Sequence, residues 1–562
     1  MADARADEVL RRFAILEGNR GIWNQHWTEI NDRVMVRPSG FNRSIVPGSK
    51  NTSLVFDSTA AQALLRYAAA VESVLCARNQ QWHGLEPADP EIADDPECKA
   101  YCEALTKLLF RVRYGAFSSF SAEAQECFLE LGAFGTHIML CDDAANHERV
   151  TPSRAPIVYQ SMPLCDSYIE ENALGRVDTL YRLIRWDARQ VIHNFGIDKT
   201  PRKIVEAYDK KQDRKWTFIH RVSPTVDYDR TAWDRRALPY SSCYVWRDEP
   251  ETVEESGLRT MPYAVGRSTT NPDEVYGRSP AMTVLPDIKM VNEVNKTMIR
   301  AGHKLVDPPL LIYDDGLGSM LDVTPNALNY GMMDESGHAR AAPLNSGGRY
   351  DVGVDQRQDL RTSINTGFYI TLFQILVENR QMTAYEAMLR AQEKAELLGP
   401  TFGRQESEFL APIIERELDI LWSKGIIQRT IGPMPRKLEQ SGGILQIAFT
   451  NQLAYMRRAP EAVRTLTSIQ QLAPLASIDP AVMEGFDPDG VREVIMDANG
   501  VPQKARRTPE QLAAFREQKQ AQANAAALVQ AAPLVGSAVK DIAQAQSTAD
   551  VQRLPVALPR AA

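Results

Sequence analysis

The segment from Tyr276 to Leu376 constrains the fold of this chain most strongly, because it has the pattern of two helices that enclose a compact non-helical insert. The first helix is predicted from about Ser279 to Leu305, where apolar residues recur every three or four positions, the repeat of one helical face. The pattern stops at Asp307-Pro308-Pro309, because consecutive prolines lack an amide hydrogen and clash with the preceding turn. The apolar positions are Leu285, Ile288, Val291, Val294, Met298, Ala301 and Leu305.

A second face of this helix is basic. A charged helical face is most often simply solvated, so the stripe alone does not identify a nucleic-acid site. Pro286 departs from the regular pattern and predicts that the helix begins or bends there. The charged stripe, at spacings that fit one helical face, consists of Lys289, Lys296, Arg300, His303 and Lys304, with Glu293 among them.

The second helical pattern runs over residues 354–376, and Arg357 and Arg361 lie one turn apart on it. Between the two helices lie roughly 45 residues rich in Gly, Pro, Asn and Asp, which is typical of turns and loops. Each helix has an apolar face with no evident partner in the lone chain. The apolar positions of the second pattern are Val354, Leu360, Ile364, Phe368, Leu372 and Ile375.

The rest of the chain predicts an α+β protein that is mainly helical. Helical patterns come first, over 5–35, 59–75, 96–113 and 119–134, and short β-branched and aromatic segments follow. The predicted strands are 137–141, 157–161, 166–170, 176–185, 215–222 and 240–247, and 187–195 is again helical. Further on, the sequence predicts a strand pair over 436–450 that turns at Gly442-Gly443, a turn at Asp487–Gly490, and a helix that starts near Thr508.

A very long helix is predicted after a polar break at residues 378–382. Thr383 and Glu386 have the spacing of a capping box, and the helical pattern continues to about residue 422. About 40 residues at about 1.5 Å each span roughly 60 Å, which exceeds the interior of one small domain. Kinks are expected at Gly399-Pro400 and at Pro412.

Bulk composition limits the classes of protein that fit. The chain has 562 residues, a net charge of −8 and seven scattered cysteines, which fit a reducing compartment. An acidic chain is not a typical nucleic-acid coat, but it suits a surface past which DNA slides, because each phosphate contact adds affinity and drag. No run of about 18 apolar residues predicts a membrane span, and the charged N-terminus predicts no signal peptide.

No motif supports an enzyme. The sequence has no Gly-x-x-x-x-Gly-Lys-Ser/Thr loop, no His-Glu-x-x-His and no Gly-x-Ser-x-Gly. Cys98 and Cys102 have the i, i+4 spacing of metal ligands, but no second Cys or His pair lies near them. The pairs Asp142-Asp143 and Asp314-Asp315 are more typical of turns than of metal sites. We therefore expect no catalytic residues, no metal and no cofactor.

Five segments occur in a distinctive order: Val-Tyr-Gly-Arg-Ser-Pro (275–280), Asp-Pro-Pro-Leu-Leu (307–311), Met-Thr-Ala-Tyr-Glu-Ala-Met-Leu-Arg-Ala-Gln-Glu (382–393), Leu-Gly-Pro-Thr-Phe-Gly-Arg (398–404) and Glu-Phe-Leu-Ala-Pro-Ile-Ile (408–414). Their order and spacing, with the Ala- and Gln-rich C-terminal helix, resemble the portal, or head-to-tail connector, proteins of short-tailed bacteriophages of the podovirus type. The resemblance runs from the helix with Trp23 and Trp27 to about Arg516 and is strongest over 275–425.

The resemblance implies a portal fold of wing, stem, clip and crown, with twelve subunits in a ring around a channel for double-stranded DNA. It places the clip between the two central helices and the tunnel loop in the polar break. The implied regions are wing 1–278, stem helix 279–305, clip 306–353, stem helix 354–376, tunnel loop 377–382, wing 383–500 and crown 501–562.

The same resemblance implies the functional surfaces and partners. The ring would sit at one capsid vertex of the virion, after assembly in the host cytoplasm, with no membrane partner. It would contact the major capsid protein, scaffold, the large subunit of the terminase motor and then tail adaptor proteins. The DNA-channel candidates are Arg380, Asn379, Gln381, Lys289, Lys296, Arg300, Arg357 and Arg361, and the clip candidates for docking are Tyr313, Asp314, Tyr330, Arg340 and Arg349.

Two alternatives stay open at this point. The chain could be another ring-forming structural virion protein, such as a head-tail adaptor, although its length and its long kinked helix disfavour this. It could also be a nucleic-acid enzyme such as a packaging nuclease, which the missing ATP-binding loop and metal clusters disfavour.

Overall fold

The computed structural model describes most of the chain up to residue 523, in two compact units, Met1–Arg464 and Thr465–Ala562. The described residues are 3–36, 41, 52–93, 95–147, 154–306, 310–312, 333, 336, 341–343, 350–372, 399, 402–450, 465–472, 474, 485, 487–498, 507 and 511–523.

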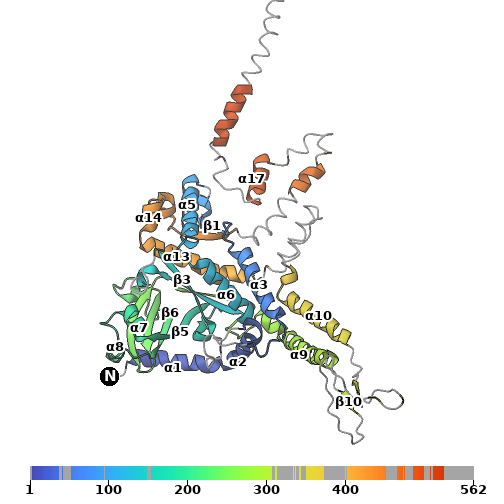
Figure 1. Ribbon diagram of the computed structural model, residues 1–562. Helices are drawn as coiled ribbons and strands as arrows, with labels where there is room; N and C mark the ends of the chain where they lie inside the picture. The colour runs from blue at the N-terminus through green and yellow to red at the C-terminus, as the bar shows by residue number, and fades with distance from the viewer. Residues whose placement is uncertain are drawn as a thin grey trace, which may run out of the picture. The chain divides into compact units, whose positions relative to one another are not determined.

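Helices dominate the described residues (Figure 1). The α-helices are α1 (Ala4–Asn19), α2 (Gly21–Ile30), α3 (Thr59–Leu75), α4 (Pro90–Ala93), α5 (Pro96–Arg113), α6 (Phe120–Phe134), α7 (Ala188–Phe195), α8 (Arg202–Asp209), α9 (Pro280–Val306), α10 (Tyr350–Gly367), α13 (Ala411–Ser423), α14 (Ile426–Thr430), α15 (Arg436–Gln440) and α17 (Pro488–Ala498). Helical residues also occur at 402–405, 465–472 and 511–523, in the π-helical segments η1 (Asn31–Met35) and η5 (Glu406–Leu410), and in the 3₁₀ turns η2 (Ala144–His147), η3 (Leu164–Asp166) and η4 (Arg235–Ala237).

The strands form four antiparallel groups in the described part of the chain. A five-stranded sheet has the order β4-β5-β6-β7-β8, a three-stranded sheet has the order β3-β2-β9, and β1 pairs with β12 as β10 pairs with β11. All six strands predicted between residues 137 and 247 are confirmed, as β2 to β7. The bounds are β1 (His83–Pro87), β2 (Thr136–Asp143), β3 (Ile157–Met162), β4 (Ser167–Glu171), β5 (Val177–Asp187), β6 (Lys215–Pro224), β7 (Tyr240–Trp246), β8 (Glu251–Leu258), β9 (Tyr263–Arg267), β10 (Leu310–Ile312), β11 (Ala341–Pro343) and β12 (Leu445–Phe449).

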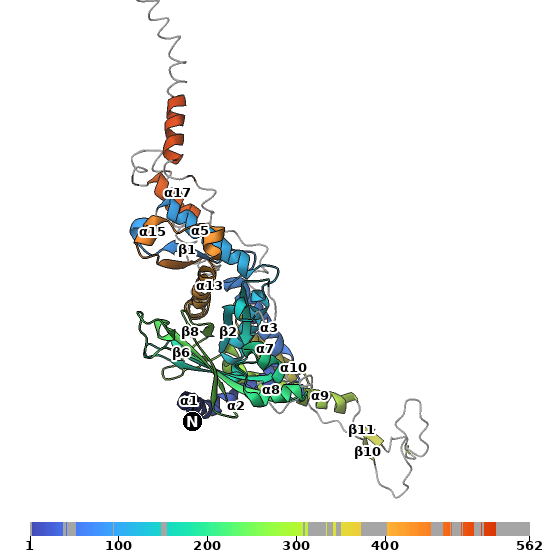
Figure 2. The same ribbon diagram turned by 90° about the vertical axis from the view of Figure 1, so that its left-hand side faces the viewer.

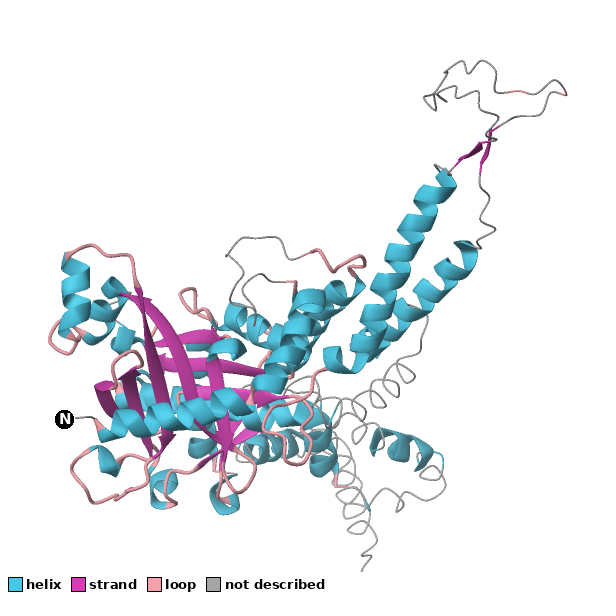
Figure 3. Cartoon of the chain, turned by 90° about the horizontal axis from the view of Figure 1, so that it is seen from below, coloured by secondary structure: helices cyan, strands magenta, loops and turns pink. Residues whose placement is uncertain are grey.

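Both faces of the five-stranded sheet are covered by helices (Figure 3). Neighbouring residues of a strand point to opposite faces, so Ile219 and Phe218 of β6 belong to different cores. On one face Ile219 packs with Phe13 of α1, and on the other Phe218 packs with α7 and α8. The predicted amphipathic helices at the N-terminus and at 187–195 thus each bury their apolar face on this sheet.

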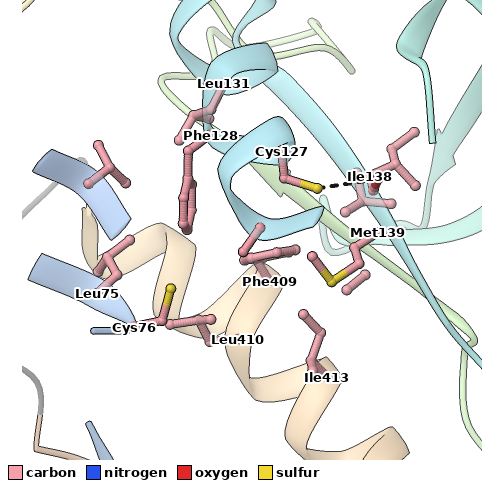
Figure 4. Packing of buried hydrophobic residues seen from close by; sticks show 14 of the residues in the cluster. Leu75, Cys76, Cys127, Phe128, Leu131, Ile138, Met139, Phe409, Leu410 and Ile413 are labelled. Atoms are coloured by element: carbon pink, nitrogen blue, oxygen red, sulfur yellow. Dashed lines mark hydrogen bonds between the residues drawn. The ribbon is translucent and has the colours of Figure 1, made fainter. Parts of the chain in front are cut away.

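The largest core joins segments that lie far apart in the sequence. Phe128 of α6 packs edge-on against Phe409 of η5, with ring centroids 6.0 Å apart. Figure 4 shows Leu75 of α3 and Ile413 of α13 in the same cluster. The Cys127 thiol donates a hydrogen bond to the Ile138 carbonyl, with a sulfur–oxygen distance of 3.6 Å. The described end of the predicted long helix is therefore a central element of the core.

The first central helix is confirmed almost residue for residue, since α9 spans Pro280–Val306. Pro286 lies inside α9 on its exposed side, and the helix continues through it. The second helix starts and breaks earlier than the repeat over 354–376 predicts, because α10 spans Tyr350–Gly367. Tyr369 then takes φ +59°, a left-handed conformation that interrupts an α-helix. Residues 373–376 lie outside the described residues.

The prediction of a strand pair over 436–450 was wrong. Pro435, with φ −56°, precedes helix α15, and only the second half of the segment forms a strand, β12. Gly442 and Gly443 end the helix with φ of 92° and 67°, where a glycine is the least strained residue. The partner of β12 is β1, with His83 opposite Phe449, and such a distant pairing leaves no local signal.

Two further predictions concern helix ends. The predicted turn at Asp487–Gly490 instead opens α17, where the Asp487 carboxylate accepts hydrogen bonds from the amides of Asp489 (3.0 Å) and Gly490 (3.1 Å). A kink was expected at Pro412, which lies in the first turn of α13, and the π-helical segment η5 directly precedes this helix. The helix predicted beyond Thr508 is observed over 511–523, and Thr508 itself lies outside the described residues. The kink expected at Gly399-Pro400 also stays a prediction, because Pro400 lies outside the described residues.

Candidate functional site

The paired helices α9 and α10 carry the channel candidates that the structure describes. Close contacts with α6 and β2 fix the start of α9. The Ser279 hydroxyl donates to the Ala133 carbonyl (2.8 Å) and accepts from the Met282 amide (3.0 Å), which caps the helix. A Cβ added at Gly277 would lie 2.3 Å from the Gly135 carbonyl oxygen, so only glycine fits there. The Tyr-Gly-Arg-Ser-Pro motif therefore connects α9 to the end of α6 and the start of β2 through close contacts.

Two glycines of α10 allow it to approach α9 closely. A Cβ added at Gly353 would lie 3.2 Å from the Met298 side chain, and one added at Gly367 would lie 2.1 Å from Cγ1 of Val284. These contact points are fourteen residues apart on α9 (284 to 298) and on α10 (353 to 367), so the pair is antiparallel and stays in register over about 21 Å. Figures 1 and 2 show the two helices side by side, with β10 beyond them.

A buried carboxylate ties both helices to the start of α3. The Asp57 carboxylate is 5% exposed and accepts hydrogen bonds from the Asn295 amide group (2.7 Å) and from Nε of Arg361 (2.9 Å). Asn292 accepts from the backbone amides of Phe56 (2.7 Å) and Asp57 (3.0 Å). Burial raises the pKa of Asp57, but hydrogen bonds from Thr59 and the Arg361 guanidinium outweigh it, and the pKa lies below its ordinary value.

Sequence reasoning missed this cluster of Asp57, Asn292 and Asn295. The available signal in the sequence was that Asn292 and Asn295 directly follow Val291 and Val294 of the apolar stripe. In the structure both asparagines are buried, with 5% and 7% of their surface exposed. A buried amide requires hydrogen-bond partners, so their positions could have indicated a contact with another segment.

The basic candidates on the helices occupy different environments. Lys289 forms an ion pair with Glu29 of α2 at 2.6 Å, and Lys296 forms one with Glu293 at 3.2 Å. Arg361 is held by Asp57 in the buried cluster. Arg300 is exposed, and Arg357 is half-buried with a buried Nε that has no hydrogen-bond partner. The structure thus brings Lys296 and Arg300 onto one outer side of α9, while Lys289 and Arg361 serve contacts with the body of the protein.

The other candidates lie outside the described residues. These are the tunnel-loop residues Arg380, Asn379 and Gln381, and the clip residues Tyr313, Asp314, Tyr330, Arg340 and Arg349. Their proposed roles stay predictions.

A second buried arginine holds the segment that leads into η5. Arg267 of β9 is 2% exposed and pairs with Glu408 of η5 (2.8 Å) and with Glu171 at the end of β4. Burial lowers the pKa of Arg267, but the hydrogen bonds that its guanidinium donates to the Glu408 carboxylate outweigh this, and the pKa is raised. Gln405 donates to the Arg267 carbonyl (2.7 Å) and lies 2.8 Å from Nε2 of His137, whose pKa burial lowers to about 4. The π-helical segment is therefore rigidly fixed to the three-stranded sheet.

The residues considered as metal ligands have other contacts. Cys98 and Cys102 are buried, and burial raises the pKa of Cys102 to about 12, which disfavours the thiolate that binds metal. Asp142 pairs with Arg416 at 3.1 Å, and Asp143 pairs with Lys424. No group of three or more potential metal ligands occurs among the described residues, and no helix of the described part is long and apolar enough to cross a membrane.

Comparison with known proteins identifies the family. Residues 6–506 match the model of the bacteriophage head to tail connecting protein family. A probable portal protein of Bordetella phage BPP-1 is 28% identical over 92% of this chain and 92% of its own length. A portal protein of Salmonella phage epsilon15 is 24% identical over 98% of this chain and 97% of its own length.

Solved structures of phage-like particles give weaker matches. A chain from the neck of a native gene transfer agent particle is 10% identical, covers 72% of this chain and 85% of its own, and has a TM-score of 0.32. A chain from the virion of the native particle is 11% identical, covers 81% and 89%, and has a TM-score of 0.33. The family match and the two phage relatives confirm the resemblance drawn from the ordered motifs, and they favour a portal over another structural virion protein. The chain belongs to the bacteriophage head to tail connecting protein family.

Proposed function

We propose that this chain is the portal subunit of a short-tailed phage, twelve copies of which form a ring at one capsid vertex. Double-stranded DNA is packaged and ejected through the channel of this ring. The chain acts as a conduit and docking platform and not as an enzyme, and it uses no cofactor. Membership of the connector family is the observation that carries this proposal.

The surface of the helix pair supports assembly with further copies. Met290 and Ile299 of α9 and Val352 of α10 are 50%, 49% and 53% exposed. Apolar side chains left half-exposed along one element favour burial against another surface, because each buried side chain adds about 1.5–3 kcal/mol relative to full exposure. In a ring, the neighbouring copies supply that surface. The α9–α10 pair then makes up most of the stem, and the clip, at 306–353, consists mainly of the residues between the two helices.

The remaining regions follow the same plan. Residues 1–278 and 383–500 form the wing, 377–382 the tunnel loop and 501–562 the crown. The clip receives the terminase motor during packaging in the host cytoplasm and the tail adaptors afterwards, and the wing contacts the capsid protein and scaffold. An acidic chain, with net charge −8, limits adhesion of DNA to the channel wall.

Electron microscopy of the purified full-length protein tests this function. Top views in negative stain should show closed rings with a central hole and twelvefold rotational symmetry. A protein that stays monomeric at every concentration and salt condition would contradict the proposal.

The tunnel loop gives a narrower test. Arg380→Ala should leave the ring intact and change the amount of DNA packaged or retained, since Arg380 is proposed to touch DNA and no neighbouring subunit. Loss of rings in this variant would instead place Arg380 at a subunit contact.

A further inference from the structure

One end of the five-stranded sheet exposes four large apolar side chains. The turn between β4 and β5 and the loop 225–239 between β6 and β7 both lie at this end, because Leu180, near the start of β5, is opposite Val222, near the end of β6. A tryptophan is rarely left in water, since it carries a large apolar surface. We call these four side chains the apolar loop end, and their exposed fractions are 84% for Leu174, 92% for Val226, 49% for Tyr228 and 103% for Trp233.

The loop 225–239 is held in shape by its own hydrogen bonds. The amide of Thr225 donates to the Pro239 carbonyl (2.8 Å), and the amide of Asp229 donates to the Arg236 carbonyl (2.9 Å). The Asp229 carboxylate also accepts from the amide (2.9 Å) and the hydroxyl (2.7 Å) of Thr231. A partner that binds such a loop does not have to order it first, so little of the binding free energy is lost to ordering.

The opposite end of the sheet differs, because its charges have partners within the same copy. In the turn between β7 and β8, Arg247 pairs with Glu17 of α1 at 3.2 Å, and Glu249 pairs with Lys203 of α8. At the apolar loop end, the fully exposed Trp233 packs against no described residue of its own copy. The described residues of the copy thus leave most of this apolar surface uncovered.

The chemistry of the loop favours a protein partner over DNA. The loop 225–239 contains three aspartates and three arginines, so its formal charge is zero. A surface without net positive charge gains little from phosphate contacts, which supply most of the non-specific affinity for DNA. Tryptophan and tyrosine, in contrast, are enriched among the residues that dominate the binding energy of protein interfaces.

The position of the apolar loop end favours a second copy as that partner. Arg267 donates to the carbonyl of Gly175 (2.9 Å), next to Leu174, and to the carbonyl of Val275 (3.1 Å), shortly before α9. The turn with Leu174 therefore lies beside the root of α9. In the proposed ring the α9–α10 pairs stand around the channel, and neighbouring copies are closest together near the channel. The nearest surface of another protein is then the next copy.

We infer that the apolar loop end is a docking surface for a second copy of this chain, with Trp233 as the side chain that anchors the contact. This inference rests on the proposed ring and names a surface that closes it. The contact is head-to-tail, because the apolar loop end of each copy meets a different surface of the next copy, and such contacts close into a ring.

Photo-crosslinking of the full-length protein identifies what covers Trp233. The protein is purified with p-benzoylphenylalanine in place of Trp233 and irradiated, so that this chain is the only protein present. Assembled material should yield covalently linked pairs of chains on a denaturing gel, and the unassembled fraction of the same preparation should not. Peptide mass spectrometry of the linked pairs then locates the surface that receives the side chain.

Side-chain truncation measures the contribution of Trp233. Trp233→Ala should lower the fraction of rings seen by mass photometry by about tenfold or more, the effect expected of an interface hot spot. Trp233→Phe keeps an aromatic ring and should lose fewer rings than Trp233→Ala. The control Ile197→Ala removes a side chain that is 60% exposed in the connection between α7 and α8, and it should form rings to within about twofold of the wild type. Thermal melts followed by circular dichroism should be the same for all variants, because Trp233 contributes no packing within its own copy.

The outcomes separate this inference from the proposed function. Rings at the wild-type level in Trp233→Ala, or the absence of links between copies after irradiation, would overturn the docking surface while the ring itself stands. Normal rings of Trp233→Ala that fail to enter capsids would assign the apolar loop end to the capsid protein and also overturn it. A wild-type protein that never forms rings would overturn both.

Discussion

The close approach of α10 to α9 at Gly367 gives the sharpest stability prediction. A methyl group at this position would lie 2.1 Å from Cγ1 of Val284, well inside the contact distance of two carbon atoms. Val284 is 5% exposed and β-branched, so it has little freedom to move away. Overpacking of this kind costs about 1–3 kcal/mol, and alanine gains at most about 1 kcal/mol over glycine in a helix. We therefore expect Gly367→Ala to destabilise the protein by about 1–2 kcal/mol.

Gly353 on the same helix is the matched control. A methyl group there would lie 3.2 Å from Cγ and Sδ of Met298, a flexible side chain that can yield. Gly353→Ala should therefore be neutral or stabilise by up to about 1 kcal/mol. Urea unfolding followed by circular dichroism measures both, and hydrogen exchange of α9 and α10 locates the change.

A compensating substitution checks the mechanism. Val284→Ala removes Cγ1, so Gly367→Ala should cost less in that background than in the wild type, a coupling that a double-mutant cycle detects. If Gly367→Ala is as stable as the wild type, or if the two changes are simply additive, the tight packing deduced for this level of the helix pair is wrong.

Two other predictions concern buried charges, and a third concerns the close backbone approach at Gly277. Asp57→Asn removes a carboxylate whose pKa is lowered by folding, so its contribution is present above the unfolded pKa of about 3.9 and lost as pH falls through the folded value. The wild type should lose more stability than the variant on acidification below about pH 4, and parallel pH curves would refute this. Glu417→Gln leaves Arg113, 0% exposed, without its charge partner and should cost about 3–5 kcal/mol in unfolding experiments; a loss under 1 kcal/mol would contradict the buried pair. Gly277→Ala should lower the melting temperature by several degrees, whereas Arg278→Ala, in an exposed i, i+4 pair, should change stability by about 0.5 kcal/mol or less; equal effects would count against the close contacts at Gly277.

Local patterns in the sequence predicted the elements whose apolar faces are continuous. The apolar repeat from Leu285 to Met298 predicted α9, and all of its members except Val294 are buried. Short segments rich in β-branched and aromatic residues after His137 predicted the strands β2 to β7. The break after Gly367 was not predicted, because Phe368 and Leu372 continue the apolar repeat past the left-handed residue Tyr369.

Contacts between distant segments could not be predicted in this way. Asp57 and Arg361 are far apart in the sequence, and their pairing depends on how α3 packs beside α10. The same holds for β12, because its partner strand β1 lies far earlier in the sequence, with His83 opposite Phe449. The sequence predicted a basic stripe on the first helix, but it could not show that Lys289 of this stripe pairs with Glu29 of α2.

A reconstruction of the assembled full-length protein by cryo-electron microscopy tests the central claim most directly, namely that α9 and α10 of successive copies form the wall of a DNA channel. We predict a closed twelvefold ring in which the α9–α10 pairs stand side by side around the channel. A ring in which this helix pair lies away from the channel, or an assembly without closed symmetry, would contradict the claim.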